Sequence, residues 1–105
     1  IKVVDWMKVQ NYLDDAATVI NTTSLGMIGK EDLPISLDKL KKNTLVTDIV
    51  YTPLKTPLLA YASKNGCRIV DGLGMLIYQA IPGFERWFGI KPTDSPDLRE
   101  LLLRE

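Results

Sequence analysis

The chain has 105 residues, of which 46% are hydrophobic and 25% charged, with 13 basic and 13 acidic side chains and no formal net charge. This length predicts one domain at most, and the balanced charge argues against nucleic acid or an anionic membrane as partner. Without histidine, the chain cannot complete a Ser-His-Asp or Cys-His catalytic arrangement or most zinc sites, so we expect no metal site. No apolar run is long enough to span a bilayer, and the single cysteine favours a reducing cytoplasm.

The first part of the chain predicts two strands and two weak helices. Ile1 to Trp6 is apolar and β-branched, which predicts a buried strand, and a weak helical pattern follows from Met7 to Ala17. Because that first run starts without an initiator methionine, we interpret the chain as a fragment of a longer protein. A short strand is predicted over Thr18 to Asn21, and a short helix over Ser36 to Lys42 with Ser36 as its N-cap.

The middle of the chain carries the clearest signals. Thr44 to Tyr51 predicts a strand that ends before Pro53. Thr56 and Pro57 form an N-cap and first-turn pair for a helix that runs to Asn65, with Gly66 just beyond its end. Cys67 to Val70 predicts the next strand.

A long helix begins at the glycine turn after that strand. Pro82 deletes one helical hydrogen bond, so we expect a kink or a restart near Ile81, and Gly89 ends the helix. A final helix is predicted for residues 95–105, beginning at Ser95 and Pro96. The face of the long helix that we expect in the core comprises Leu73, Ile77, Ala80, Phe84 and Trp87.

Strands that alternate with helices at this spacing predict an α/β fold with a parallel sheet covered on both faces. In such sheets, ligands bind beyond the carboxyl ends of the strands. Three polar segments follow predicted strands, namely Thr22 to Ser24, Asp48 to Tyr51, and Asp71 to Gly74. Each segment alone is also consistent with an ordinary turn, because hydroxyl residues and glycine are common turn formers.

Four groups of residues, in order and closely spaced, together resemble the C-terminal part of shikimate dehydrogenase. They are Asn21 to Met27, Asp48 to Leu54 with Thr56 to Leu59, Asp71 to Leu76 with Gln79 and Ala80, and Phe84, Glu85, Trp87 and Gly89. The resemblance implies a partial Rossmann-like, three-layer α/β/α fold with a mostly parallel sheet, lacking the first βαβ unit and its glycine-rich turn. Residues 1–105 would be a C-terminal fragment of the NADP-binding domain, with the helix of residues 95–105 docking towards a missing substrate domain.

The family reduces 3-dehydroshikimate reversibly to shikimate with NADPH in aromatic amino acid biosynthesis. The resemblance therefore implies NADP as cofactor, a small-molecule substrate and a cytoplasmic enzyme. The Lys and Asp that transfer protons in the family have no counterpart in this chain. We therefore expect no catalytic residue here, and we expect the fragment alone to be inactive.

The resemblance also implies roles for eight residues. The residues expected to bind the cofactor are Thr22, Thr23, Ser24, Ile49, Gly72 and Met75. Tyr51 and Gln79 are expected to hydrogen-bond the substrate, because a hydroxyl and an amide both donate and accept. For Met75, a position in the core is an equal alternative.

Two alternatives stay open, one a related enzyme and the other a protein of another class. A quinate/shikimate dehydrogenase shares these motifs, and the two substrates would have to be compared directly. A non-catalytic nucleotide-binding module of the same family would hold a ligand without turnover. The sequence alone predicts neither the oligomeric state nor the preference between NADP and NAD.

Overall fold

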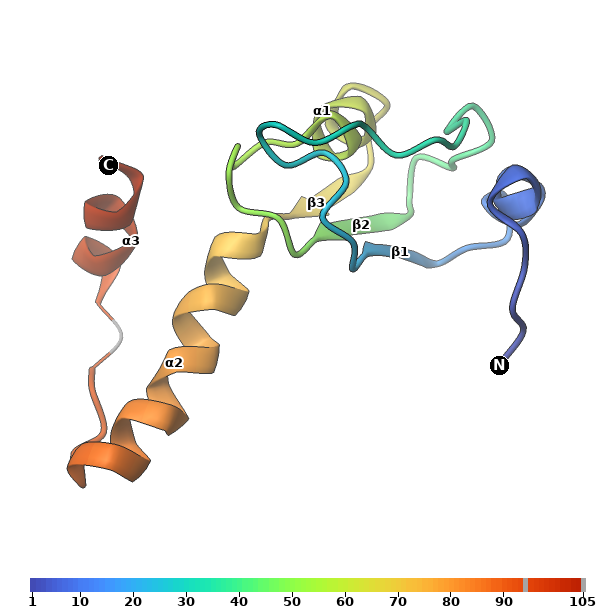
Figure 1. Cartoon of the computed structure of the whole chain (residues 1–105). Coiled ribbons are helices and arrows are strands. Elements are labelled where there is room, and N and C mark those ends of the chain that lie inside the picture. The colour runs from blue at the N-terminus through green and yellow to red at the C-terminus, as the bar shows by residue number, and fades with distance from the viewer. Residues whose placement is uncertain (94, 105) are drawn as a thin grey trace. The chain divides into compact units, whose positions relative to one another are not determined.

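The computed structural model describes residues 1–93 and 95–104 of the chain (Figure 1). It divides into two compact units, Ile1–Gly72 and Leu73–Glu105. The elements, in chain order, are the 3-10 helix η1 (Trp6–Tyr12), strand β1 (Thr18–Asn21), strand β2 (Leu45–Asp48), helix α1 (Pro57–Lys64), strand β3 (Arg68–Val70), helix α2 (Gly72–Phe88) and helix α3 (Pro96–Leu103).

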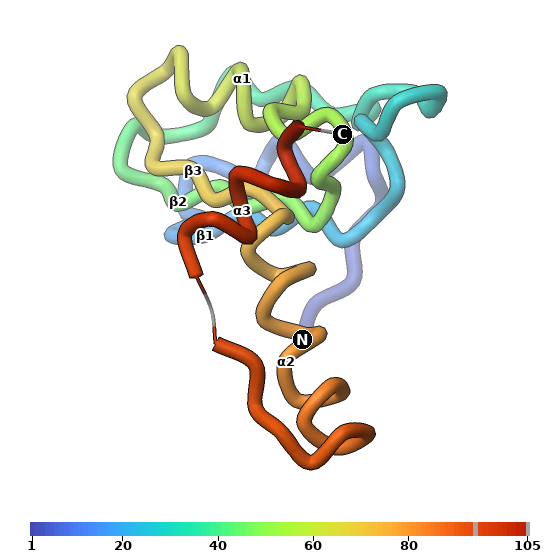
Figure 2. The backbone as a smooth tube through the Cα atoms, turned by 90° about the vertical axis from the view of Figure 1, so that its left-hand side faces the viewer, coloured from blue at the N-terminus to red at the C-terminus, as the bar shows by residue number. Residues whose placement is uncertain are grey.

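The first unit is built on a parallel sheet of three strands in the order β1-β2-β3, which run side by side in both views (Figures 1 and 2). Asn21 lies opposite Asp48 in the register of β1 and β2, so these two strands end level with each other. The predicted α/β fold with a parallel sheet is thereby confirmed. The sheet brings the segments that follow β1 and β2 to one edge.

Helix α1 begins where the sequence predicts and ends at Lys64, one residue before the predicted end at Asn65. Thr56 precedes the helix with extended backbone angles, and its side chain accepts a hydrogen bond from the backbone N–H of Leu59. Pro57 occupies the first turn, where its missing N–H costs nothing. At the other end, Gly66 adopts a φ of +79°, a left-handed conformation that glycine adopts without strain.

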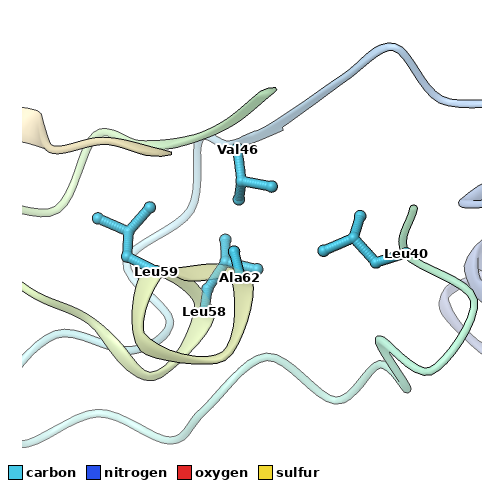
Figure 3. Packing of buried hydrophobic residues seen from close by; sticks show 5 residues of the cluster. All are labelled: Leu40, Val46, Leu58, Leu59 and Ala62. Atoms are coloured by element: carbon cyan, nitrogen blue, oxygen red, sulfur yellow. The ribbon is translucent and has the colours of Figure 1, made fainter. Parts of the chain in front are cut away.

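The core of the first unit lies between the sheet and α1 (Figure 3). Figure 3 shows Val46 of β2 pointing towards Leu59 and Ala62 of α1, while Leu40 approaches from the preceding loop. Val46, Leu59 and Ala62 are fully buried. This apolar contact fixes α1 on one face of the sheet and so fixes the segment that joins β2 to α1.

The prediction of a strand over Ile1 to Trp6 is wrong. Residues 1–5 form no regular element, and Trp6–Tyr12 forms the 3-10 helix η1, whose N-cap Asp5 accepts a hydrogen bond from Met7 N–H at 2.9 Å. A strand is stable only when a neighbouring strand takes up its backbone hydrogen bonds, and none pairs with residues 1–5 here. The β-branched composition of this segment is therefore not sufficient by itself to form a strand.

The prediction of a helix over Ser36 to Lys42 is also wrong. The segment forms turns, with one backbone hydrogen bond of 2.9 Å from Leu40 N–H to the carbonyl of Leu37. Ser36 Oγ donates to the Asp38 carboxylate at 2.9 Å, so this pair bonds locally instead of capping a helix. Seven residues are too few to make a helix stable by itself, and the burial of Leu40 in the core determines the path.

The second unit consists of α2 and α3. Helix α2 runs through Pro82 from Gly72 to Phe88, so the restart expected near Ile81 is not found, and Gly89 ends the helix with a φ of +69°. Helix α3 begins after Ser95 as predicted, while residue 105 of the expected span lies outside the described residues. Of the expected core face, Leu73 and Ile77 are buried, whereas Ala80 and Phe84 are exposed and Trp87 is 80% exposed.

Among the described residues, no helix combines the length and the apolar character needed to cross a lipid bilayer.

Candidate functional site

The paired ends of β1 and β2 carry a buried polar network. Asn21 and Asp48 are the last residues of these strands and are 4% and 1% exposed. The Asn21 side-chain amide donates a hydrogen bond of 3.0 Å to Oδ1 of Asp48. Because a buried carboxylate is costly unless it is hydrogen-bonded, this contact is a requirement of the fold as well as a link between the strands.

The loop after β1 turns on the side chain of Asn21. Its Oδ1 accepts hydrogen bonds from the backbone N–H of Thr23 at 3.0 Å and from the Thr23 hydroxyl at 2.7 Å. Its Nδ2 donates a further bond of 3.0 Å to the carbonyl of Leu25, and the Thr23 hydroxyl accepts from Leu25 N–H at 3.1 Å. Residues 21–25 are therefore held in one compact turn by two side chains.

The loop after β2 turns in the same way on Asp48. Its Oδ1 accepts a hydrogen bond of 2.9 Å from the backbone N–H of Val50, two residues further on. Its Oδ2 accepts from the hydroxyl of Thr56 at 2.7 Å, and Thr56 caps helix α1. One carboxylate thus connects the ends of two strands to the start of the following helix.

A cavity of about 300 Å³ lies beyond these strand ends, between the two loops. It is lined by Thr22, Thr23, Ser24, Met27, Ile49, Val50, Tyr51 and Thr52. Five of the eight residues expected to bind cofactor or substrate are among them. The structure therefore brings together the two polar segments that the sequence placed at this edge.

The chemistry of this lining is that of a binding site. Of the residues that the structure describes around the cavity, Tyr51 is the only one with a titratable side chain. Within the described part of the chain, the hydroxyls of Thr22, Ser24 and Tyr51 have no hydrogen-bond partner, in contrast to the Thr23 hydroxyl. Three hydroxyls beside the apolar side chain of Ile49 suit an uncharged polar ring or a sugar rather than proton transfer.

The missing side chain of Gly72 leaves room for backbone atoms of the protein itself, whereas we expected this glycine to contact the cofactor. A Cβ at this position would lie 2.7 Å from the carbonyl oxygen of Val50 and still closer to that of Ile49. Glycine is therefore required so that the segment after β2 can pass close to the start of α2. By contrast, a Cβ on Gly74 would meet no atom within 4 Å.

Met75 and Gln79 both belong to the second unit and are described within it. Met75 is 51% exposed, which does not support the alternative of a core position. Gln79 is exposed at a cavity of about 440 Å³ between α2 and α3, whose lining is otherwise mainly apolar. That cavity includes Leu76, Ile77, Phe84, Leu98 and Leu102.

Asn21, Asp48 and Thr56 are the residues whose role sequence reasoning missed. The motifs contain Asn21 and Asp48 but indicate no role for either residue. The sequence predicts Thr56 only as the cap of a helix. A usable signal exists, because a polar residue ends each of two neighbouring strands. In the part of the chain that the structure describes, no group of three or more potential metal-binding side chains is found.

Comparison with known proteins finds that the chain is similar to parts of shikimate dehydrogenases and related enzymes. The family model of the shikimate 5'-dehydrogenase C-terminal domain matches residues 72–95. A protein from Cereibacter sphaeroides described as shikimate dehydrogenase (NADP(+)) is 58% identical over 103 residues, which are 98% of this chain and 37% of that protein. The chain thus spans little more than a third of the length of this curated relative.

Solved structures show the same relationship. Quinate dehydrogenase from Corynebacterium glutamicum, in complex with NAD, has a TM-score of 0.86 at 33% identity, covering 97% of this chain and 36% of that one. Shikimate 5-dehydrogenase from Thermus thermophilus, in complex with NADP(H) and shikimate, has a TM-score of 0.75 at 27% identity, covering 90% of this chain and 36% of that one. The resemblance of the chain to the C-terminal part of shikimate dehydrogenases is confirmed.

Proposed function

We propose that this chain, which is related in sequence to the C-terminal part of shikimate dehydrogenases, forms part of the nucleotide-binding domain of an NADP-dependent shikimate dehydrogenase. The observation that carries the proposal is the 58% identity, over 98% of the chain, to a relative described by that name. The cavity beyond the ends of β1 and β2 supports it, because nucleotides bind at this edge of Rossmann-like sheets.

The reaction is the reversible reduction of 3-dehydroshikimate to shikimate. NADPH, when bound, supplies the hydride that the substrate carbonyl carbon accepts, and the carbonyl oxygen takes up a proton. No acid or base other than Tyr51 lines the cavity in the described part of the chain, so we assign the proton to a group outside these 105 residues. The present residues bind and orient, a contribution to the rate through geometry, and the chain alone is expected to be inactive.

The cavity fits one half of a dinucleotide. Its volume of about 300 Å³ is at the lower end for ligand sites. We assign Thr22 and Ser24 to cofactor hydroxyl or phosphate groups, and Thr23 to holding their loop. Ile49 supplies the apolar wall against the nicotinamide half, and we also assign Gly72 and Met75 to contacts with the cofactor.

The substrate groups are assigned to two polar side chains. The Tyr51 hydroxyl and the Gln79 amide can each donate and accept, so they can recognise the hydroxyls or the carboxylate of shikimate without a charge of their own. We also propose that residues 95–105 dock towards the substrate domain, since the leucines of α3 are exposed. A cytoplasmic enzyme agrees with the single cysteine, Cys67.

A quinate/shikimate dehydrogenase is the second candidate. The observation that favours it is the TM-score of 0.86 to a quinate dehydrogenase in complex with NAD. The two substrates differ little at the reacting carbon, and the segments that line the cavity carry no charged group that would select between the cofactors.

The test uses a chimera in which residues 1–105 replace the matching part of the Cereibacter sphaeroides enzyme, so that the chain acts in an intact protein. The absorbance of reduced nicotinamide is followed with shikimate or quinate, each with NADP or NAD. Reduction of NADP with shikimate supports the first candidate, and preference for quinate supports the second. A folded chimera that is inactive with all four pairs contradicts both and favours a binding module.

A further inference from the structure

The two walls of the cavity are joined at their base by a hydrogen bond between side chains. One wall consists of Thr22–Ser24 after β1, and the other of Ile49–Thr52 after β2. The Asn21 amide and the Asp48 carboxylate lie at the base of these walls and are joined by the hydrogen bond of 3.0 Å. At their base, a contact between side chains therefore adds to the backbone pairing of β1 and β2 in setting the separation of the walls.

Neither anchor residue is available to a ligand. Both are buried, and their polar atoms are hydrogen-bonded inside the protein. Asn21 uses Oδ1 for Thr23 and Nδ2 for Leu25 and Asp48. Any effect of this pair on a bound molecule must consequently be transmitted through the two loops.

The hydrogen bonds of the pair orient the lining directly. Asn21 holds the backbone N–H of Thr23, and Asp48 holds the backbone N–H of Val50, each two residues beyond its own strand. Both of the residues held in this way line the cavity. Fixing these N–H groups fixes the path of the two loops beyond the sheet. It thereby fixes the positions of Thr22, Ser24, Ile49 and Tyr51.

Two backbone hydrogen bonds also join the two walls. Ile49 N–H donates to the carbonyl of Asn21 at 3.1 Å, and Ile28 N–H donates to the carbonyl of Thr52 at 3.1 Å. The walls are thus tied to each other at the base and again further along the loops. The base is the point at which side chains, and not the backbone alone, determine the geometry.

We propose that Asn21 and Asp48 act together as positioning residues, which hold the two walls at the separation that a nicotinamide ring and its substrate require. The inference rests on the proposed function and adds to it two residues that touch neither molecule. A misplacement of about 1 Å in an enzyme site costs on the order of 100-fold in rate, so a small displacement of either wall is sufficient to be measured.

The decisive variant is Asn21→Ala in the chimera, because it removes the side-chain contact between the walls while the Asp48 carboxylate keeps its hydrogen bonds from Val50 and Thr56. Thr44→Val is the matched control. The Thr44 hydroxyl is equally buried and donates a hydrogen bond of 3.1 Å to the carbonyl of Ala16, at the amino end of β2 and away from the cavity. Asn21→Ala removes four side-chain hydrogen bonds and Thr44→Val removes one, all in the same unit, but only Asn21 contacts the walls.

We expect kcat of Asn21→Ala to fall on the order of 100-fold, with a smaller change in KM, while Thr44→Val stays within about threefold of wild type. A conservative variant sharpens the test. In Asp48→Asn, Oδ1 still accepts from Val50 and Asn21, so the contact between the walls is kept, although the Thr56 hydroxyl loses the acceptor Oδ2; activity should stay within about tenfold of wild type. Equal kcat values for Asn21→Ala and Thr44→Val would overturn the proposal.

Hydrogen exchange of the backbone amides gives a readout that does not depend on activity. In Asn21→Ala, exchange should rise about tenfold in both residues 22–28 and residues 49–53, while Thr44→Val leaves both segments as in wild type. A rise in the first segment alone contradicts a shared anchor. If the wild-type chimera has no activity with any substrate, the proposed function fails, and the exchange result still decides whether Asn21 couples the walls.

Discussion

The backbone of Gly72 packs so closely against that of Val50 that a Cβ on the glycine would lie 2.7 Å from the Val50 carbonyl oxygen. Gly74, two residues further along α2, has open space at the corresponding position. The two glycines of this turn therefore have different reasons to be glycine. Gly72 permits a close backbone contact, whereas a Cβ on Gly74 would meet no neighbouring atom.

Gly72→Ala is expected to destabilise the chimera by about 1–3 kcal/mol, because backbone atoms cannot move aside as a flexible side chain would. Gly74→Ala is the control and should be neutral or stabilising by up to about 1 kcal/mol, since alanine favours a helix over glycine. Urea denaturation of the two variants measures both effects. Equal stabilities would show that the segment after β2 can shift without cost.

Tyr51→Phe is expected to lower kcat/KM with shikimate by about 10- to 100-fold, equivalent to the loss of one buried hydrogen bond of about 1–3 kcal/mol. Stability should not change, because the hydroxyl makes no hydrogen bond within the described part of the chain. Tyr12→Phe is the matched control, as Tyr12 is 43% exposed against 45% for Tyr51 and does not line the cavity. Unchanged kinetics in Tyr51→Phe would remove this residue from the substrate site.

Thr56→Val is expected to reduce the free energy of unfolding by about 2 kcal/mol, because it keeps the shape of the side chain and removes both of its hydrogen bonds. Asp48 Oδ2 loses its donor at 2.7 Å, and Leu59 N–H loses its cap. Thr56→Ser retains the hydroxyl and should cost less than half as much. Chemical denaturation compares them, and two equal losses would mean that the methyl group contributes as much to stability as the hydroxyl, contrary to this expectation.

Pro82→Ala is expected to stabilise α2 by up to about 3 kcal/mol, because the helix continues through a residue that cannot donate a backbone hydrogen bond. Pro96→Ala is the control. Pro96 lies at the start of α3, where an N–H has no helical partner, so no gain is expected. Helical circular dichroism during thermal unfolding records the difference, and a gain at neither position would place the limit on α2 stability elsewhere.

The accuracy of the sequence predictions followed the range of the interactions involved. Helix α1 was predicted to within one residue at its end because Thr56, Pro57 and Gly66 act within one turn of the helix. The strand expected over residues 1–6 failed because a strand depends on a partner elsewhere in the chain. Propensity describes a residue's local preference, and pairing is a property of the whole fold.

In the candidate site, too, what could be predicted depends on the range of the interactions. The cavity residues Thr22 to Ser24, Ile49 and Tyr51 were predicted from the motifs that contain them. The hydrogen bond between Asn21 and Asp48 was not, because it joins residues 27 positions apart and depends on the register of two strands. Seeing a polar residue at the end of each strand does not show that the two meet.

The hydrogen-bonded set of Asn21, Asp48 and Thr56 also limits how this segment can diverge. Each member supplies a donor or an acceptor that another member needs inside the protein, so a change at one position leaves a polar atom unpaired until a second change follows. Single substitutions at these positions are therefore disfavoured during evolution, even where they alter no contact with a ligand. Related proteins that keep these loops should inherit the three residues as one unit, and should lose them as one.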